Sequence, residues 1–201
     1  MGKSSGGTRD FPSGGGVEKL DIKNPRDLAT IKNNAVYREM KRGISRYHAV
    51  LGVRERSVKL ADLPMTVNGA LANVGASNQS IYLNANVFDK LSKSAIEDRV
   101  KMSYKTGWSA KTNKPIQHTI THELAHATWN SDMKSAKAKA AGKEINRLGR
   151  QWLNDDKKKG YGRYGESSVD EFWAEVTTKA IHGTPDKYTR KVKAIVKKYK
   201  L

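Results

Sequence analysis

Apolar residues recur every three or four positions along much of this chain, a spacing typical of helices with one buried face. The pattern predicts helices over 25–50, 86–104 and 133–153, and a last helix with Tyr188, Val192, Ile195, Val196 and Tyr199 on its inner face. We expect the first helix to start at Asn24 and Pro25, because proline fits the first turn of a helix, and to break near Gly43.

Two shorter stretches follow the alternating pattern of strands. Residues 57–67 predict one or two short strands, and residues 78–84, after Gly75, predict another. Residues 1–16 are rich in glycine and serine and predict a disordered tail, since they cannot bury apolar surface. The chain is therefore expected to form one α+β domain over 17–201, with helices packed around a small mixed sheet.

Length and composition agree with a single domain and restrict the available chemistry. The chain has 201 residues and no cysteine, so any metal ion must be held by histidine and carboxylate side chains. No apolar run is long enough to span a membrane, and the N-terminus has no apolar secretory segment. We expect a cytoplasmic location by default, with a virion-associated or toxin-associated setting as the alternative.

The most informative stretch is His-Thr-Ile-Thr-His-Glu-Leu-Ala-His at 118–126. His122 and His126 are four residues apart, so on a helix both imidazoles face the same way and can bind one Zn²⁺. Glu123 then lies beside the ion, where its carboxylate can take a proton from water. Pro115 predicts the start of this helix.

A second acidic motif follows further along the chain. Ser167 or Ser168 is placed to cap a helix whose first turns carry Glu171 and Glu175 on one face. One carboxylate could bind a metal ion while the other orients a histidine ligand. A solvated acidic face is the alternative, but apolar neighbours such as Trp173 indicate a buried helix.

These motifs resemble the catalytic domain of anthrax lethal factor and related gluzincin metallopeptidases. The resemblance covers about residues 75–185, with motif matches at 118–129 and 161–176. It implies a zincin-like fold, in which Glu171, the first residue of Glu-Phe-Trp-Ala-Glu, is the third zinc ligand. It also implies that Tyr164, seven residues earlier, faces the metal from the opposite side.

The resemblance further implies a zinc metalloendopeptidase that binds one Zn²⁺ per chain and cleaves a protein or peptide substrate. His122, His126 and Glu171 would be the ligands, Glu123 the general base, and Tyr164 a hydrogen-bond donor to the developing oxyanion.

Three further residues are candidates for roles at this site. Tyr161 is the alternative to Tyr164, because Tyr-Gly-Arg-Tyr offers two phenols three residues apart. Glu175 is expected to orient one of the histidine ligands. His118 would either contact substrate or cap the metal-binding helix, and we favour the cap.

In zincin folds, an edge strand before the metal-binding helix pairs with the substrate backbone. The predicted strand at 78–84 occupies that place in the sequence, and strand addition would give affinity through main-chain hydrogen bonds. The substrate-binding residues are then expected to be Ser80, Ile81, Tyr82 and Leu83.

The charge supports an alternative function. Thirty-eight basic against twenty acidic residues give a net charge of +18, which favours weak contact with nucleic acid or another anionic surface. The chain could then be a non-catalytic, basic structural or nucleic-acid-binding protein that keeps a zincin fold. DNA-associated proteases of the Spartan type share the zinc motif, but their third ligand is a nearby downstream histidine. No histidine lies between His126 and His182 here.

Overall fold

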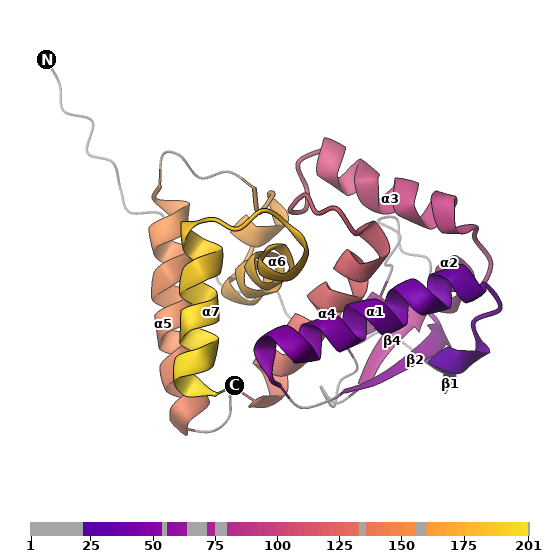
Figure 1. The fold of residues 1–201 in the computed structure, drawn as a ribbon, viewed down its shortest axis with the longest axis horizontal. Coiled ribbons are helices and arrows are strands. Elements are labelled where there is room, and N and C mark those ends of the chain that lie inside the picture. Colours follow the sequence, from indigo (N-terminus) through magenta and orange to yellow (C-terminus); the bar gives the residue numbers. More distant parts are fainter. Residues whose placement is uncertain are drawn as a thin grey trace, which may run out of the picture.

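The computed structural model describes residues 22–53, 56–63, 72–74, 80–132, 136–155 and 160–200. The tail at 1–16 and the stretch Met65–Val67 lie outside these residues, so the predictions made for them stay predictions. The described part is mostly helical with one small mixed sheet, which confirms the α+β class (Figure 1). None of its helices combines the length and the hydropathy that crossing a bilayer would need.

The sheet has four strands in the order β1-β2-β4-β3. They are β1 (Lys23–Asp27), β2 (Ser57–Asp62), β3 (Ala72–Val74) and β4 (Ser80–Asn84). Strands β2 and β4 run parallel in the middle, and β1 and β3 pair antiparallel on the two sides.

The edge position expected for Ser80, Ile81, Tyr82 and Leu83 is wrong. Val58 of β2 pairs with Ile81 on one side of β4, and Val74 of β3 pairs with the same residue on the other. Both main-chain edges of β4 are therefore occupied within the sheet. The side chains of Ile81 and Leu83 are fully buried. The edges of the described sheet are instead β1 and β3, each antiparallel to its neighbour.

The first long helix, α1 (Asn34–Leu51), starts later than predicted. Asn33 caps it by accepting hydrogen bonds from the backbone N–H groups of Ala35 and Val36. Pro25 lies instead in β1, at the edge of the sheet, where a residue without an N–H is tolerated. The helical spacing after Pro25 partly reflects the short helix η1 (Leu28–Thr30), which is capped by Asp27.

The predicted break at Gly43 is also wrong, because α1 runs through this residue. The glycine at this position is needed for close packing, because a Cβ atom there would lie 2.6 Å from Ile120 Cγ2 on the neighbouring helix. That distance is too short for two carbon atoms, so Gly43 allows α1 and the helix that carries Ile120 to approach closely.

The other helices agree broadly with the predicted ranges. The stretch 86–104 forms two helices, α2 (Ala85–Phe88) and α3 (Lys93–Lys105), because Ser92 caps a new start. They are followed by α4 (Pro115–Asp132), α5 (Ala136–Leu153), η2 (Tyr164–Glu166), α6 (Val169–His182) and α7 (Lys187–Tyr199).

Helix α4 is the centre of the arrangement. It packs against α1, α3 and α6 and against strands β3 and β4, while α5 and α7 lie side by side beyond α6 (Figure 1). Two buried hydrogen bonds fix its position: Trp173 Nε1 donates to the Ala125 carbonyl at 2.8 Å, and Tyr47 donates to the Leu124 carbonyl at 3.1 Å. The His-Glu-Leu-Ala-His motif is thus carried by the central helix of the described fold.

Candidate metal centre

Helix α4 begins at Pro115, as predicted, and the carbonyl of Lys114 accepts the first helical hydrogen bond, from His118 N. The helical repeat then places His118, His122 and His126 one turn apart along the same side of the helix. This side faces the N-terminal turns of α6, which carry the two predicted carboxylates.

Three predicted ligand atoms converge at one point. His122 Nε2 and His126 Nε2 are 3.0 Å apart, and each lies 3.2 Å from Glu171 Oε2. Tetrahedral zinc with bonds of about 2.0–2.1 Å places neighbouring donors about 3.3 Å apart. The three atoms therefore have nearly the spacing of one face of such a tetrahedron, and the side chains that carry them fit a zinc ion.

The electrostatics of this group favour a cation. Burial alone would lower the pKa of His122, but the carboxylates of Glu171 and Glu175 raise it well above its usual value. Burial likewise opposes the charge on Glu171, yet contacts with both histidines hold the pKa of this carboxyl well below its usual range. Two acids facing these imidazoles thus attract positive charge, which a divalent cation supplies.

Helix α6 is positioned by its cap. Ser168 is the N-cap, and its hydroxyl accepts a hydrogen bond from Glu171 N, which agrees with one of the two predicted serines. The cap places Glu171 in the first turn and Glu175 one turn deeper. The helix is buried along most of its length, so the alternative of a solvated acidic face is excluded.

Glu175 lies behind the predicted ligands and is fully buried. Its Oε1 atom is 3.2 Å from His122 Nδ1, and its Oε2 atom accepts a hydrogen bond from Ala110 N at 2.6 Å. A carboxylate at Nδ1 favours the tautomer with a free Nε2 lone pair, and Nε2 is the atom that meets Glu171 and His126. Glu175 is therefore placed to orient the His122 imidazole toward a metal ion.

His118 does not cap α4, so that expectation is wrong. Its side chain is buried, with Nε2 4.0 Å from Glu175 Oε1 and the ring packed edge-on against Tyr104. Glu175 therefore lies between His118 and His122, and the three side chains form one buried group. The sequence signal for this buried position was that His118 lies one helical turn before His122.

The structure also brings Asp170 to the site, a residue that the sequence did not single out. Its Oδ2 atom is 3.9 Å from His126 Nδ1, so each histidine ligand faces a carboxylate on the side away from Glu171. The sequence signal that could have indicated Asp170 was its position directly before Glu171.

Glu123 follows His122 on α4 and is partly buried. Burial raises the pKa of its carboxyl, while His122 and His126 act in the opposite direction. An acid with a raised pKa beside the predicted ligands has the character of a general base that must later give its proton away.

Tyr164 lies against the predicted ligands, and Tyr161 does not. The Tyr164 ring stacks on the His122 ring with centroids 5.6 Å apart and on Trp108 at 5.4 Å. Tyr161 is fully buried, and its hydroxyl donates to both carboxylate oxygens of Asp186 at 2.6 and 2.8 Å. Of the two phenols, only Tyr164 is therefore placed to act at the centre.

The loop that carries Tyr164 is fixed to the preceding loop. Tyr164 N donates to the Trp108 carbonyl at 2.8 Å, and Arg163 N donates to the Gly107 carbonyl at 2.9 Å. Gly162 has a positive φ of 65°, and a Cβ atom there would lie 2.3 Å from the Trp108 oxygen. Burial raises the pKa of Tyr164 far above its usual value, so its hydroxyl stays protonated and can donate a hydrogen bond.

The structure thus shows an α+β protein in which two histidines and one glutamate form a group that could hold a metal ion. No family model, curated protein or solved structure gives a significant match to this chain.

Proposed function

We propose that this protein is a zinc-dependent metalloendopeptidase of the gluzincin type. The observation that carries the proposal is the meeting of His122 Nε2, His126 Nε2 and Glu171 Oε2 within 3.2 Å of one another, beside Glu123. A structural zinc site has four protein ligands, whereas a catalytic site has three and keeps one position open. Among the described residues, the group at this point has three members.

The donor set favours zinc among the common metals. Imidazole nitrogen suits zinc, and two histidines with one glutamate form a ligand set that is typical of catalytic zinc in peptidases. When bound, zinc would polarise the substrate carbonyl and make water acidic enough to react near neutral pH.

The protein's own groups would perform the remaining steps. Glu123 takes a proton from the attacking water and passes it to the amine that leaves when the peptide bond breaks. The protonated hydroxyl of Tyr164 donates a hydrogen bond to the carbonyl oxygen as this atom becomes negative. Glu175, itself held by Ala110 N, keeps His122 in the orientation that the reaction needs.

The substrate would bind as an extended peptide along β3. This strand is one of the two antiparallel edges of the described sheet, next to β4, and it packs beside α4. Addition of a substrate strand to this edge would supply main-chain hydrogen bonds without reading sequence, so side-chain pockets would determine selectivity.

Metal analysis and a cleavage assay test the proposal together. Zinc-loaded protein is expected to hold about one zinc per chain and to cleave members of a mixed peptide library. Glu123→Gln should keep the zinc and lose activity by orders of magnitude, because the amide cannot accept a proton. The peptidase assignment fails if zinc-loaded wild type cleaves no library peptide, or if the variant cleaves at the wild-type rate.

A further inference from the structure

Helices α5 and α7 form one end of the molecule and turn their apolar sides inward. They lie side by side and pack against α6 (Figure 1). The buried positions are Ala138, Ala141, Ile145, Leu148 and Trp152 on α5 and Tyr188, Val192, Ile195 and Val196 on α7. The opposite sides of both helices therefore form a continuous surface toward solvent.

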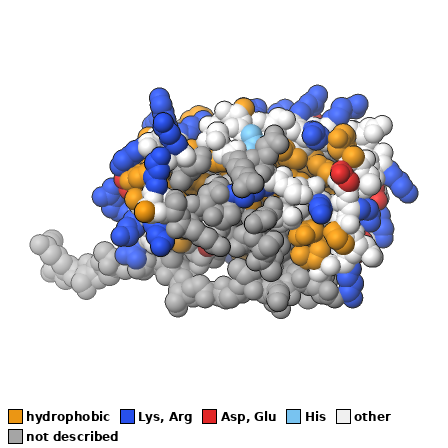
Figure 2. Space-filling view, turned by 90° about the horizontal axis from the view of Figure 1, so that it is seen from below, with side chains coloured by type: hydrophobic (Ala, Val, Ile, Leu, Met, Phe, Trp, Pro, Cys, Tyr) orange, Lys and Arg blue, Asp and Glu red, His pale blue; other side chains and the backbone are white. Residues whose placement is uncertain are grey.

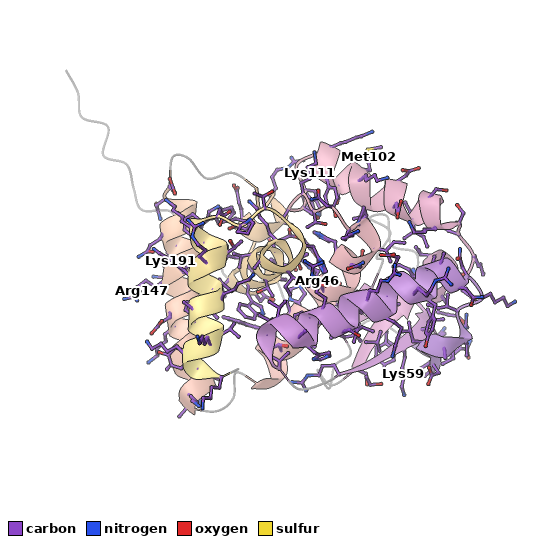
Figure 3. The ribbon with its side chains drawn as sticks, viewed as in Figure 1. Arg46, Lys59, Met102, Lys111, Arg147 and Lys191 are labelled. Carbon is purple, nitrogen blue, oxygen red and sulfur yellow. The ribbon has the colours of Figure 1, made fainter. Side chains whose placement is uncertain are left out.

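This surface carries a strong excess of positive charge. Eleven of the chain's 38 lysine and arginine residues lie on α5 and α7, against one of its 20 acidic residues, Glu144. Figure 2 shows lysine and arginine side chains at this end as well as at the opposite end, and in Figure 3 the labelled Arg147 and Lys191 lie on α5 and α7. The excess is much larger than the average for the chain.

Most of these cations have no acidic partner. Lys198 pairs with Glu144 and Lys187 with Asp155. Among the described residues of α5 and α7, the other exposed cations that form no ion pair are Lys137, Lys139, Lys143, Arg190, Lys191, Lys193 and Lys197. Arg147 also acts on the charge of Glu144, one helical turn away. Like charges one helical turn apart repel each other by a few tenths of a kcal/mol per pair, so the arrangement costs some stability in the free protein.

The cations form two rows rather than one cluster. Lys139, Lys143 and Arg147 follow at four-residue intervals along α5, which places them about 6 Å apart along the helix axis. On α7 the corresponding row is Arg190, Lys193 and Lys197, and packed helix axes lie about 8–10 Å apart. Two rows of cations spaced about one helical turn apart fit a polymer of repeated phosphates better than they fit a single small anion.

The same surface lacks the features that other anionic partners require. The exposed large apolar side chains of the described residues are Val50, Met102 and Trp108, and all three lie outside α5 and α7. A helix that binds a bilayer surface needs apolar side chains to insert, and single-stranded nucleic acid is usually held by exposed aromatic rings. A phosphate backbone held by charge alone requires neither.

We propose that the α5/α7 surface binds the phosphate backbone of double-stranded nucleic acid without sequence preference. The proposal is independent of the peptidase function, because none of these residues belongs to the metal centre. Binding would release counterions, so the affinity falls steeply as the salt concentration rises.

A matched pair of variants tests this surface. In the first variant Lys139, Lys143, Lys193 and Lys197 become glutamine. In the control, four exposed lysines elsewhere become glutamine, namely Lys32, Lys90, Lys101 and Lys105. Both variants lose the same charge, and surface changes of this kind rarely alter stability by more than about 0.5 kcal/mol. Thermal unfolding followed by circular dichroism confirms that each is folded.

The measurement is fluorescence anisotropy of two labelled DNA duplexes of unrelated sequence between about 50 and 200 mM salt. Wild type should bind both duplexes equally. The first variant should bind at least about tenfold more weakly, with a salt dependence smaller by about three to four in logarithmic slope. The control should stay within about threefold of wild type.

Three results would overturn the proposal. The first is no duplex binding by wild type at about 50 mM salt. The second is an equal loss in the control variant, which would assign binding to net charge alone. The third is binding of the wild-type protein to phosphatidylserine vesicles but not to the duplexes, which would show that this surface binds a membrane.

Discussion

Replacing Glu175 by glutamine would test how the metal centre is held together. The substitution keeps the shape of the side chain but exchanges one acceptor oxygen for an NH₂ donor. In the structure both oxygens face donors: Oε2 accepts from Ala110 N, and Oε1 faces His122 Nδ1. The single oxygen of a glutamine side chain can accept from only one of these two N–H groups. The other N–H group then faces the NH₂ donor of the glutamine inside a fully buried site.

The size of the effect follows from this mismatch. A buried polar group left without its partner costs about 1–3 kcal/mol. If the amide turns its oxygen to Ala110, its NH₂ group faces His122 Nδ1 in place of a carboxylate oxygen, and the orientation of this imidazole for metal binding is lost. Removing such an orienting carboxylate typically weakens metal affinity 10-fold to 100-fold, or about 1.4–2.7 kcal/mol. We expect Glu175→Gln to weaken zinc binding within this range.

Competition with a chromophoric zinc chelator measures the affinity of wild type and variant directly. Glu97→Gln is a suitable control, because Glu97 is a partly buried carboxylate on α3 that pairs with Lys93 and Lys101. The control should bind zinc as wild type does. Wild-type zinc affinity in a folded Glu175→Gln protein would refute the idea that Glu175 orients His122.

Further predictions concern phenols and pH. Tyr164→Phe should lower the turnover rate about 100-fold at unchanged zinc content, the usual effect of losing one oxyanion donor. Tyr161→Phe should instead leave turnover unchanged and lower the free energy of unfolding by about 1–3 kcal/mol in urea titrations; the opposite pattern would reassign the roles. Burial, with Arg46 and Lys114 nearby, lowers the pKa of His182 to about 4. The unfolded chain, with a His182 pKa of about 6.5, therefore binds the proton more readily. The stabilising contribution is complete above about pH 6.5 and is lost as the pH falls toward 4, by about 3 kcal/mol in total. Metal-free His182→Gln should show a smaller loss of unfolding free energy between pH 7 and pH 4.5 than metal-free wild type, and equal losses would contradict the prediction.

The sequence predicted best those features that depend on local spacing. Two histidines four residues apart on a helix must share a face, and Ser168 caps α6 because its hydroxyl lies close to Glu171 N. These local rules fixed which side chains of α4 and α6 could meet. The meeting itself required only that the two buried helices pack against each other.

The sequence predicted less well what depends on distant partners. The interior place of β4 depends on β2 and β3 pairing with it from both sides, which its own alternation cannot show. Pro25 satisfied the rule for a helix start, but pairing with β2 placed its segment in an edge strand. Gly43 predicted a break from propensity alone, whereas its role is the close approach of another helix.

The short loop that leads into α4 joins two functions of the proposed site. The Trp108 carbonyl holds Tyr164 N, and the Trp108 ring stacks on the Tyr164 ring. Two residues later, Ala110 N holds Glu175, which faces His122. A backbone shift in this loop would move the phenol and the orienting carboxylate together. In the proposed peptidase, metal affinity and catalytic rate would therefore be coupled, and mutations in this loop would change both together.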